Sequence, residues 1–163
     1  MVWRGPMASG ALQQMIESTR WGELDVLFVD MPPGTGDIQL TVSQRTRLAG
    51  AVVVTTPQDI ALIDARRAIE MFQKVSVPII GMVQNMATHI CSNCGHEDPV
   101  FGSDGGQTLA NEYEAPVLAN IPLSRVIRET SDAGAPISAV DNDGSVAAAY
   151  REAAAGVMTT LSG

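Results

Sequence analysis

Two cysteines and two histidines lie within the eight residues "HICSNCGH", at positions 89–96. Cys91 and Cys94 have Cys-x-x-Cys spacing, and they are the only cysteines in the chain. In a protein without features of secretion, this spacing indicates metal or redox chemistry more than a structural disulfide. A closed site of four thiolates would need both cysteines from each of two copies, and it suits zinc or a [4Fe-4S] cluster.

Two alternatives to such a shared site stay open at this point. His89 and His96 flank the cysteines and could complete a His₂Cys₂ zinc site within one chain. The ligands of that site would be crowded more closely than the usual two-part spacing. The cysteines could also form a zinc knuckle that only holds its loop in place.

A second group of candidate residues lies in "LDVLFVDMPPGTGD", at positions 24–37. The apolar run Val26–Val29 predicts a buried strand, which places Asp30 at its carboxyl end. A carboxylate there can hold Mg²⁺ directly or through water, and Gly34 lets backbone N–H groups approach an anion closely. The simpler interpretation is that Asp30 caps a turn and the Pro-Gly run is a tight connection.

Asn85 and Pro122 each follow a predicted strand, at the end of the sheet where ligands bind in open α/β folds. The amide of Asn85 offers one acceptor and two donors, which suits the edge of a purine base. Pro122 could pack on such a base. The simpler alternative is that the asparagine forms a turn and the proline opens a loop.

A phosphate-binding loop requires a glycine-rich run that ends in lysine. The only lysine in the chain is Lys74, and it follows Gln73 instead of a glycine. The sequence therefore contains the acid expected at one end of a nucleotide site without the lysine expected at the other.

The elements that must position these residues alternate between strands and helices. We expect one α/β domain over residues 1–163, with a mostly parallel sheet whose helices cover both faces. The helix after the second strand should start with Thr56 as its cap, Pro57 in its first turn and Asp59 three residues after the cap. The segment 88–106 holds the cysteines and histidines and is predicted as an irregular functional loop. The predicted strands are 26–29, 51–54, 79–83 and 117–121, and the predicted helices cover 8–19, 61–72 and 146–161.

Composition and charge narrow the possible functions and locations. The net charge is −8 and no basic stripe occurs, so we expect no binding to nucleic acid. No apolar run reaches the roughly 20 residues of a membrane helix, and the first ten residues lack the apolar core of a secretory signal. We therefore expect a cytoplasmic protein without membrane association.

Several longer motifs, in order along the chain, resemble the Mrp/ApbC family of iron–sulfur cluster carrier P-loop ATPases, in the MinD-like group. They are "RGPMASGALQQMIESTRWGELDVLFVDMPPGTGDIQLTVSQ", "TTPQDIALIDARRAIEMF", "VPIIGMVQNM", "CSNCG" and "IPLSRVIRETSDAGAPI". The resemblance implies a P-loop NTPase fold of the MinD/ParA type. It also implies a [4Fe-4S] cluster bridged by Cys91 and Cys94 across a homodimer, apo iron–sulfur proteins as acceptors, and ATP with Mg²⁺ in the full-length protein.

The resemblance also assigns roles to single residues. Asp30 matches the acid at the end of the Walker B strand, which supports Mg²⁺. Gly34 matches the switch glycine whose N–H faces the terminal phosphate. Asn85 resembles the asparagine that reads adenine, and Pro122 lies where family members line the base pocket.

One departure from the family is large. Family members carry a Walker A strand, loop and helix upstream of the matched stretch, and this sequence begins after that point. We therefore expect the C-terminal half of an ATPase, without ATPase activity of its own, and with an exposed sheet edge that favours dimerisation. Two other functions remain as alternatives: a dimeric zinc-binding structural module, and a fragment of a MinD/ParA-type partition ATPase.

Overall fold

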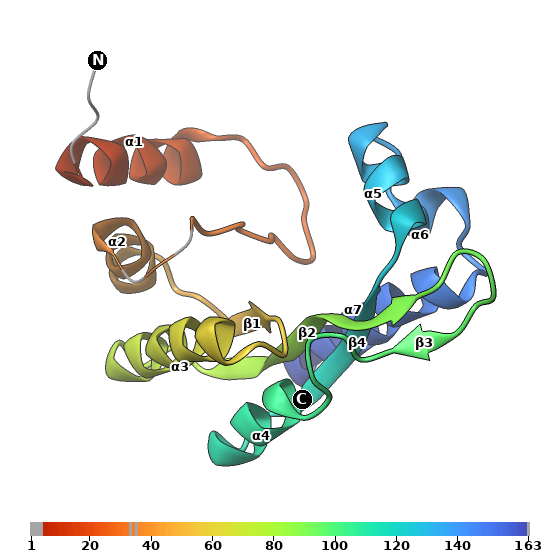
Figure 1. Ribbon diagram of the computed structural model, residues 1–163. Coiled ribbons are helices and arrows are strands. Elements are labelled where there is room, and N and C mark those ends of the chain that lie inside the picture. Colours follow the sequence, from red (N-terminus) through yellow and green to blue (C-terminus); the bar gives the residue numbers. More distant parts are fainter. Residues whose placement is uncertain (1–4, 33, 35, 163) are drawn as a thin grey trace.

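Four strands form the sheet in the part of the chain that the computed structural model describes, residues 5–32, 34 and 36–162. They are β1 (Ala51–Thr55), β2 (Ile79–Ile90), β3 (Glu97–Asp98) and β4 (Val117–Leu123). β2 pairs in parallel with both β1 and β4, and the short β3 pairs antiparallel with its final residues (Figure 1). The predicted mostly parallel sheet is therefore confirmed.

Helices cover both faces of this sheet, as predicted. The helices α3 (Asp59–Lys74) and α4 (Gly105–Glu112) lie on one face, and α7 (Ser145–Ser162) lies on the other (Figure 1). The helices α1 (Gly5–Ser18) and α2 (Asp37–Arg45) precede β1 and pack against each other, while α5 (Arg125–Asp132) and α6 (Ile137–Val140) follow β4.

Each face of the sheet has its own hydrophobic core. On one face, Ile69 of α3 and Leu109 of α4 pack with Met82 of β2, and all three are almost completely buried. On the other face, Leu118 of β4 and Val157 of α7 belong to a second cluster. Complete burial of one such large apolar side chain stabilises a fold by about 1.5–3 kcal/mol, so these clusters fix how the strands lie under the helices.

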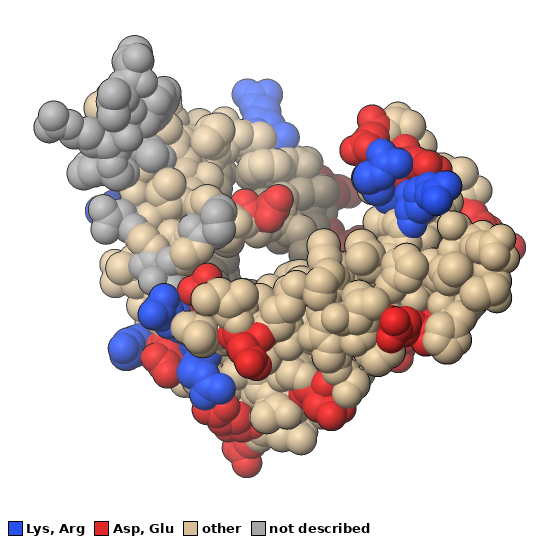
Figure 2. Space-filling view, viewed as in Figure 1, with Lys and Arg blue, Asp and Glu red and all other residues tan. Residues whose placement is uncertain are grey.

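The predicted strand Val26–Val29 is wrong, because these residues belong to no strand of the sheet. Phe28 is 70% exposed and Leu27 is 43% exposed, so the run is not buried either. A strand exists through hydrogen bonds to a neighbouring strand, and no described segment pairs with this run. Figures 1 and 2 show an open space between the connection that follows α1 and the body of the sheet.

The predicted start of α3 is also wrong, by two residues. Gln58, and not Thr56, is the N-cap, and the helix begins at Asp59. The hydroxyl of Thr56 donates to the side-chain oxygen Oε1 of Gln58 at 2.6 Å instead of accepting from a helical N–H. With its hydroxyl directed at the Gln58 side chain, Thr56 does not cap the first turn, and the helix begins two residues later than predicted.

The segment Thr88–Gly106 is more regular than predicted. β2 continues to Ile90, then turns into β3, and α4 begins at Gly105. Antiparallel pairing of Ile90 with Glu97 supplies hydrogen-bond partners for this extension of the strand. The cysteines therefore lie at the end of a β-hairpin and not in an irregular loop.

Candidate functional site

The turn that carries the cysteines is closed by backbone hydrogen bonds. The N–H of Cys91 donates to the carbonyl of His96 at 2.9 Å, and the N–H of Gly95 donates to the carbonyl of Cys91 at 2.8 Å. Gly95 has φ of +72°, a left-handed conformation that glycine adopts without steric cost. We call residues 91–96, with the strands β2 and β3 beside them, the cysteine hairpin (Figure 1).

The hairpin favours the thiolate form of Cys91. The N–H groups of Asn93 and then of Cys94 donate to its sulfur and hold the pKa of the thiol below its ordinary value. The Cys94 side chain adds to this lowering of the pKa, and partial burial opposes it. Because the thiolate is the form that binds metals, the local backbone prepares Cys91 as a ligand. Cys91 is half-buried, Cys94 is exposed, and neither forms a disulfide.

A one-chain zinc site is not assembled around these cysteines. Among the described residues, which include the whole of 88–106, no three His, Cys, Asp or Glu side chains gather as a metal site would require. His89 lies in β2 opposite Asp98, and His96 lies beyond the turn, where both are exposed. The His₂Cys₂ alternative is therefore wrong for this structure, and each chain offers two thiols.

Asp30 and Gly34 lie in the connection between α1 and α2. Asp30 is exposed and has no side-chain hydrogen bond or ion pair to any described residue. Its predicted place at the end of a sheet strand is wrong, because residues 26–29 do not join the sheet. Gly34 has φ of +99°, a conformation that favours glycine. The connection leads into the N-terminus of α2, and Gln39 of that helix donates to the carbonyl of Pro32 at 2.7 Å.

Asn85 and Pro122 lie within strands, and not after them as predicted. Asn85 of β2 lies opposite Ile121 of β4, directly before Pro122. The side-chain oxygen of Asn85 accepts the N–H of Met86 at 2.9 Å, and Met86 has φ of +54°. This left-handed residue shifts the register of β2 against β4, so Asn85 ends the regular parallel part of the strand.

The structure brings Asn85 and Pro122 to neighbouring positions on β2 and β4. It records no hydrogen bond between them and Asp30 among the described residues. The amide nitrogen of Asn85 also has no partner in that part of the chain, so its two donors remain available.

Gln84 and Arg125, to which the sequence analysis gave no role, form hydrogen bonds next to the candidate residues. Gln84 is only 5% exposed, and its Oε1 accepts the N–H of Gly106 at 2.8 Å while its Nε2 donates to Asn120 Oδ1 at 3.1 Å. The signal in the sequence was a glutamine that interrupts the apolar run of β2. Arg125, at the start of α5, donates from Nη2 to Ser92 Oγ at 3.3 Å and so contacts the cysteine hairpin.

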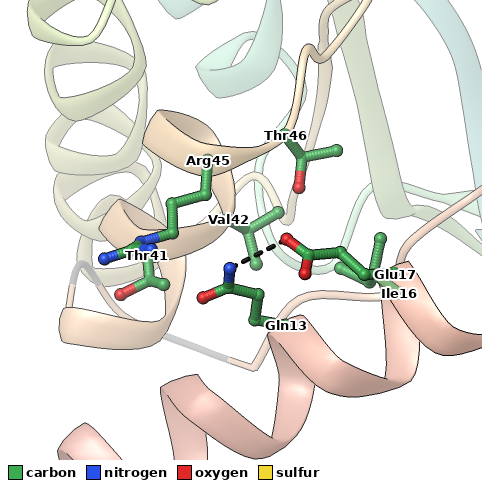
Figure 3. A pocket seen from close by; sticks show the side chains of 7 residues that line it. All are labelled: Gln13, Ile16, Glu17, Thr41, Val42, Arg45 and Thr46. Carbon is green, nitrogen blue, oxygen red and sulfur yellow. Dashed lines mark hydrogen bonds between the residues drawn. The ribbon is translucent and has the colours of Figure 1, made fainter.

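A small cavity between α1 and α2 has no relation to these candidate residues. Its volume of about 10 Å³ is the space of roughly one water molecule. Figure 3 shows Gln13 and Glu17 facing α2 across it, joined by a hydrogen bond of 2.8 Å. The cavity is lined by Gln13, Ile16, Glu17, Thr41, Val42, Arg45 and Thr46.

The face drawn in Figure 2 carries charged side chains of both signs. On the face in Figure 2, Lys and Arg side chains occur in separate small groups among acidic ones. In the part of the chain that is described, every helix is too short or too polar to cross a membrane.

Comparison with known proteins gives the family. Residues 1–158 match the family described as "ParA: NUBPL iron-transfer P-loop NTPase". The "Iron-sulfur cluster carrier protein" of Pseudomonas fragi is 56% identical over 154 residues, which cover 94% of this chain and 54% of that protein. The "Iron-sulfur cluster transfer protein NUBPL" of Mus musculus is 47% identical over 161 residues, which cover 99% of this chain and 50% of that protein. The chain thus spans about half the length of the curated relatives it matches.

Solved structures agree with this fold. A nucleotide-binding protein from Archaeoglobus fulgidus, in complex with ADP, has a TM-score of 0.70 and 37% identity, over 78% of this chain and 53% of that chain. The cell division ATPase MinD of Pyrococcus furiosus has a TM-score of 0.66 at 19% identity, over 96% of this chain and 59% of that chain, and shows the fold alone. On the extent of these matches, the chain belongs to the NUBPL-type iron-transfer P-loop NTPases, a family that includes the iron–sulfur cluster carrier proteins.

Proposed function

We propose that this chain carries iron–sulfur clusters for transfer to apo iron–sulfur proteins in the cytoplasm. A [4Fe-4S] cluster, the cargo, would be bound between two copies by Cys91 and Cys94 of each. The single observation that carries this proposal is the cysteine hairpin, which presents two free thiols, one half-buried and one exposed, at the end of β2. The names of the relatives, which are carrier and transfer proteins, support the identity of the cargo.

The donor set fits this cargo. Four thiolates from two chains give the all-cysteine ligation that [4Fe-4S] clusters take. Cys94 is exposed at the end of the hairpin, so a second copy can approach it without rearrangement of the core. A site that is half-complete in each copy also suits a carrier, because separation of the copies would release the cluster.

We further propose that Asp30, Gly34, Asn85 and Pro122 contribute to a site for ATP and Mg²⁺. Asp30 would support the metal and Gly34 the terminal phosphate, while Asn85 and Pro122 would contact the base. The available amide donors of Asn85 and its closeness to Pro122 support the base contact. The only lysine, Lys74, is the last residue of α3, so we expect this chain by itself to bind ATP weakly and not to hydrolyse it.

The test of the carrier function is anaerobic reconstitution with iron and sulfide, followed by metal and sulfide analysis and a measurement of oligomeric state. We expect about four irons per dimer. A Cys91→Ser/Cys94→Ser protein should bind none and serves as the matched control. A dimer that binds zinc and refuses iron would instead support a structural zinc module and would contradict the carrier function.

A further inference from the structure

Arg125 is held beside the cysteine hairpin by the register of the sheet. Leu123, the last residue of β4, lies opposite His89 of β2. Arg125 follows Leu123 by two residues, as Cys91 follows His89. β2 and β4 thus end side by side, so Cys91 and Arg125, which closely follow these ends, lie at the same end of the sheet.

The side chain of Arg125 uses this position to contact the turn between the cysteines. Its Nη2 donates to the hydroxyl of Ser92 at 3.3 Å, and Ser92 lies between Cys91 and Cys94 in the sequence. Both side chains are exposed, so this hydrogen bond contributes little to the stability of the fold. Its consequence is to keep a guanidinium group close to the two thiols.

The charge of Arg125 is not neutralised by a neighbouring carboxylate. Arg125 forms no ion pair with any described residue. Arg128, one turn further along α5, instead pairs with two carboxylates of its own helix, at 3.0 and 3.2 Å. The strand of the hairpin that lies beyond β2, β3, adds negative charge, because Glu97 and Asp98 are both exposed there.

Cargo bound by four thiolates is negatively charged, since the charges of the thiolates exceed that of the cluster core. A second copy also brings another pair of acidic residues on its own β3. Unfavourable interactions between these charges are reduced by a nearby cation. Charge and hydrogen bonds around the sulfurs are also among the properties that set the reduction potential of a cluster.

We propose that Arg125 is a charge-compensating residue for thiolate-bound cargo at the cysteine hairpin, where it slows release of the cluster and makes the cluster easier to reduce. This inference rests on the proposed carrier function and adds a residue to the same site. It assigns the role to the positive charge of Arg125, with the hydrogen bond to Ser92 keeping that charge in place.

The test compares four proteins after anaerobic reconstitution: wild type, Arg125→Gln, Arg125→Lys and Arg128→Gln. Arg125→Gln removes the charge and Arg125→Lys keeps it. Arg128→Gln is the matched control, because it removes a charge from the same helix that is already paired within α5. The measurements are the rate at which a chelator removes iron, at low and at high salt, and the reduction potential of the cluster.

We expect Arg125→Gln to release iron about two to five times faster than wild type at low salt, the range for one exposed charge interaction. Its cluster should also be harder to reduce, because the added electron loses a neighbouring cation. High salt should narrow the difference in release rate, since salt screens exposed charges. Arg125→Lys and Arg128→Gln should both behave like wild type.

Equal release rates and potentials in Arg125→Gln and wild type would overturn the inference and leave the carrier function intact. A lysine variant that behaves like the glutamine variant would also overturn it, because the effect would then not depend on charge. A wild-type protein that refuses iron and sulfide would overturn the carrier function and this inference together.

Discussion

Replacement of Gln84 by methionine tests how much the buried Gln84 amide stabilises the fold through its hydrogen bond to Gly106, in the segment that follows the cysteine hairpin. Gln84 is buried in β2, and its Oε1 accepts the N–H of Gly106 at 2.8 Å, near the start of α4. Methionine has a similar size and is apolar, so the change removes both hydrogen bonds of the amide while largely filling the same space. Gly106 is buried and would be left with an N–H that has lost its acceptor.

The expected loss of stability follows from that single group. A buried donor without a partner costs about 1–3 kcal/mol. The second bond, from Nε2 to Asn120 Oδ1, has an exposed partner that water can satisfy, so its loss adds little. We therefore expect the free energy of unfolding to fall by about 2 kcal/mol, as measured by urea denaturation at neutral pH.

The control is the same substitution at Gln107, one residue beyond Gly106. Its amide donates to Asn111 at 2.9 Å on an exposed face of α4, where such pairs contribute about 0.2–0.5 kcal/mol. If Gln84→Met cost no more than Gln107→Met, the Gln84 amide would not be the group that satisfies Gly106, and the reasoning would be refuted.

Three further changes test the sheet and its surroundings. In Gly81→Ala, the new Cβ would lie 2.6 Å from Leu118 Cγ, so we expect a loss of about 1–3 kcal/mol in urea unfolding, and an unchanged midpoint would contradict this contact. Burial raises the pKa of Tyr150 above its ordinary value of 10.0, so its stabilisation is present below that value and is lost as pH rises through the folded-state pKa. Tyr150→Phe should therefore lose less stability than wild type in urea titrations above about pH 10, and equal losses would contradict this. Val54 is 62% exposed, and its strand β1 pairs only with β2 among the described residues, so this edge of the sheet can pair with another molecule. Val54→Lys should therefore reduce self-association in light scattering. A wild type that is already monomeric at high concentration would contradict this.

The strands that sequence patterns predicted correctly are those whose partners are also described. The runs at 51–54, 79–83 and 117–121 became β1, the first part of β2 and most of β4, and each buries side chains under a helix. The run at 26–29 is just as apolar, but no segment in the described part of the chain pairs with it. Local composition measures a tendency to be buried, whereas strand formation also depends on a partner elsewhere in the chain.

In the candidate site, too, the sequence pattern indicates local features but not contacts between distant residues. The spacing of Cys91 and Cys94 is a local feature that predicted the pair as metal ligands, and this role remains a prediction. The bonds of Gln84 to Gly106 and of Arg125 to Ser92 join residues 22 and 33 positions apart, and no local pattern reports them. The roles of Asp30, Gly34, Asn85 and Pro122 toward a nucleotide remain predictions, as does a single domain over residues 1–163.

Met86, with its left-handed backbone conformation, interrupts the regular pairing of β2 with β4. It separates the part of the strand that lies between β1 and β4 from the part that carries the cysteine hairpin. Cys91 is five residues beyond Met86, a distance of about 16 Å along an extended strand. A change of about 10° in the bend at Met86 would therefore displace the thiol by about 3 Å, more than the length of a metal–sulfur bond. Small differences in the backbone beside Asn85 thus become large differences in the position of the thiols, which in the proposed dimeric site would decide where two hairpins can meet.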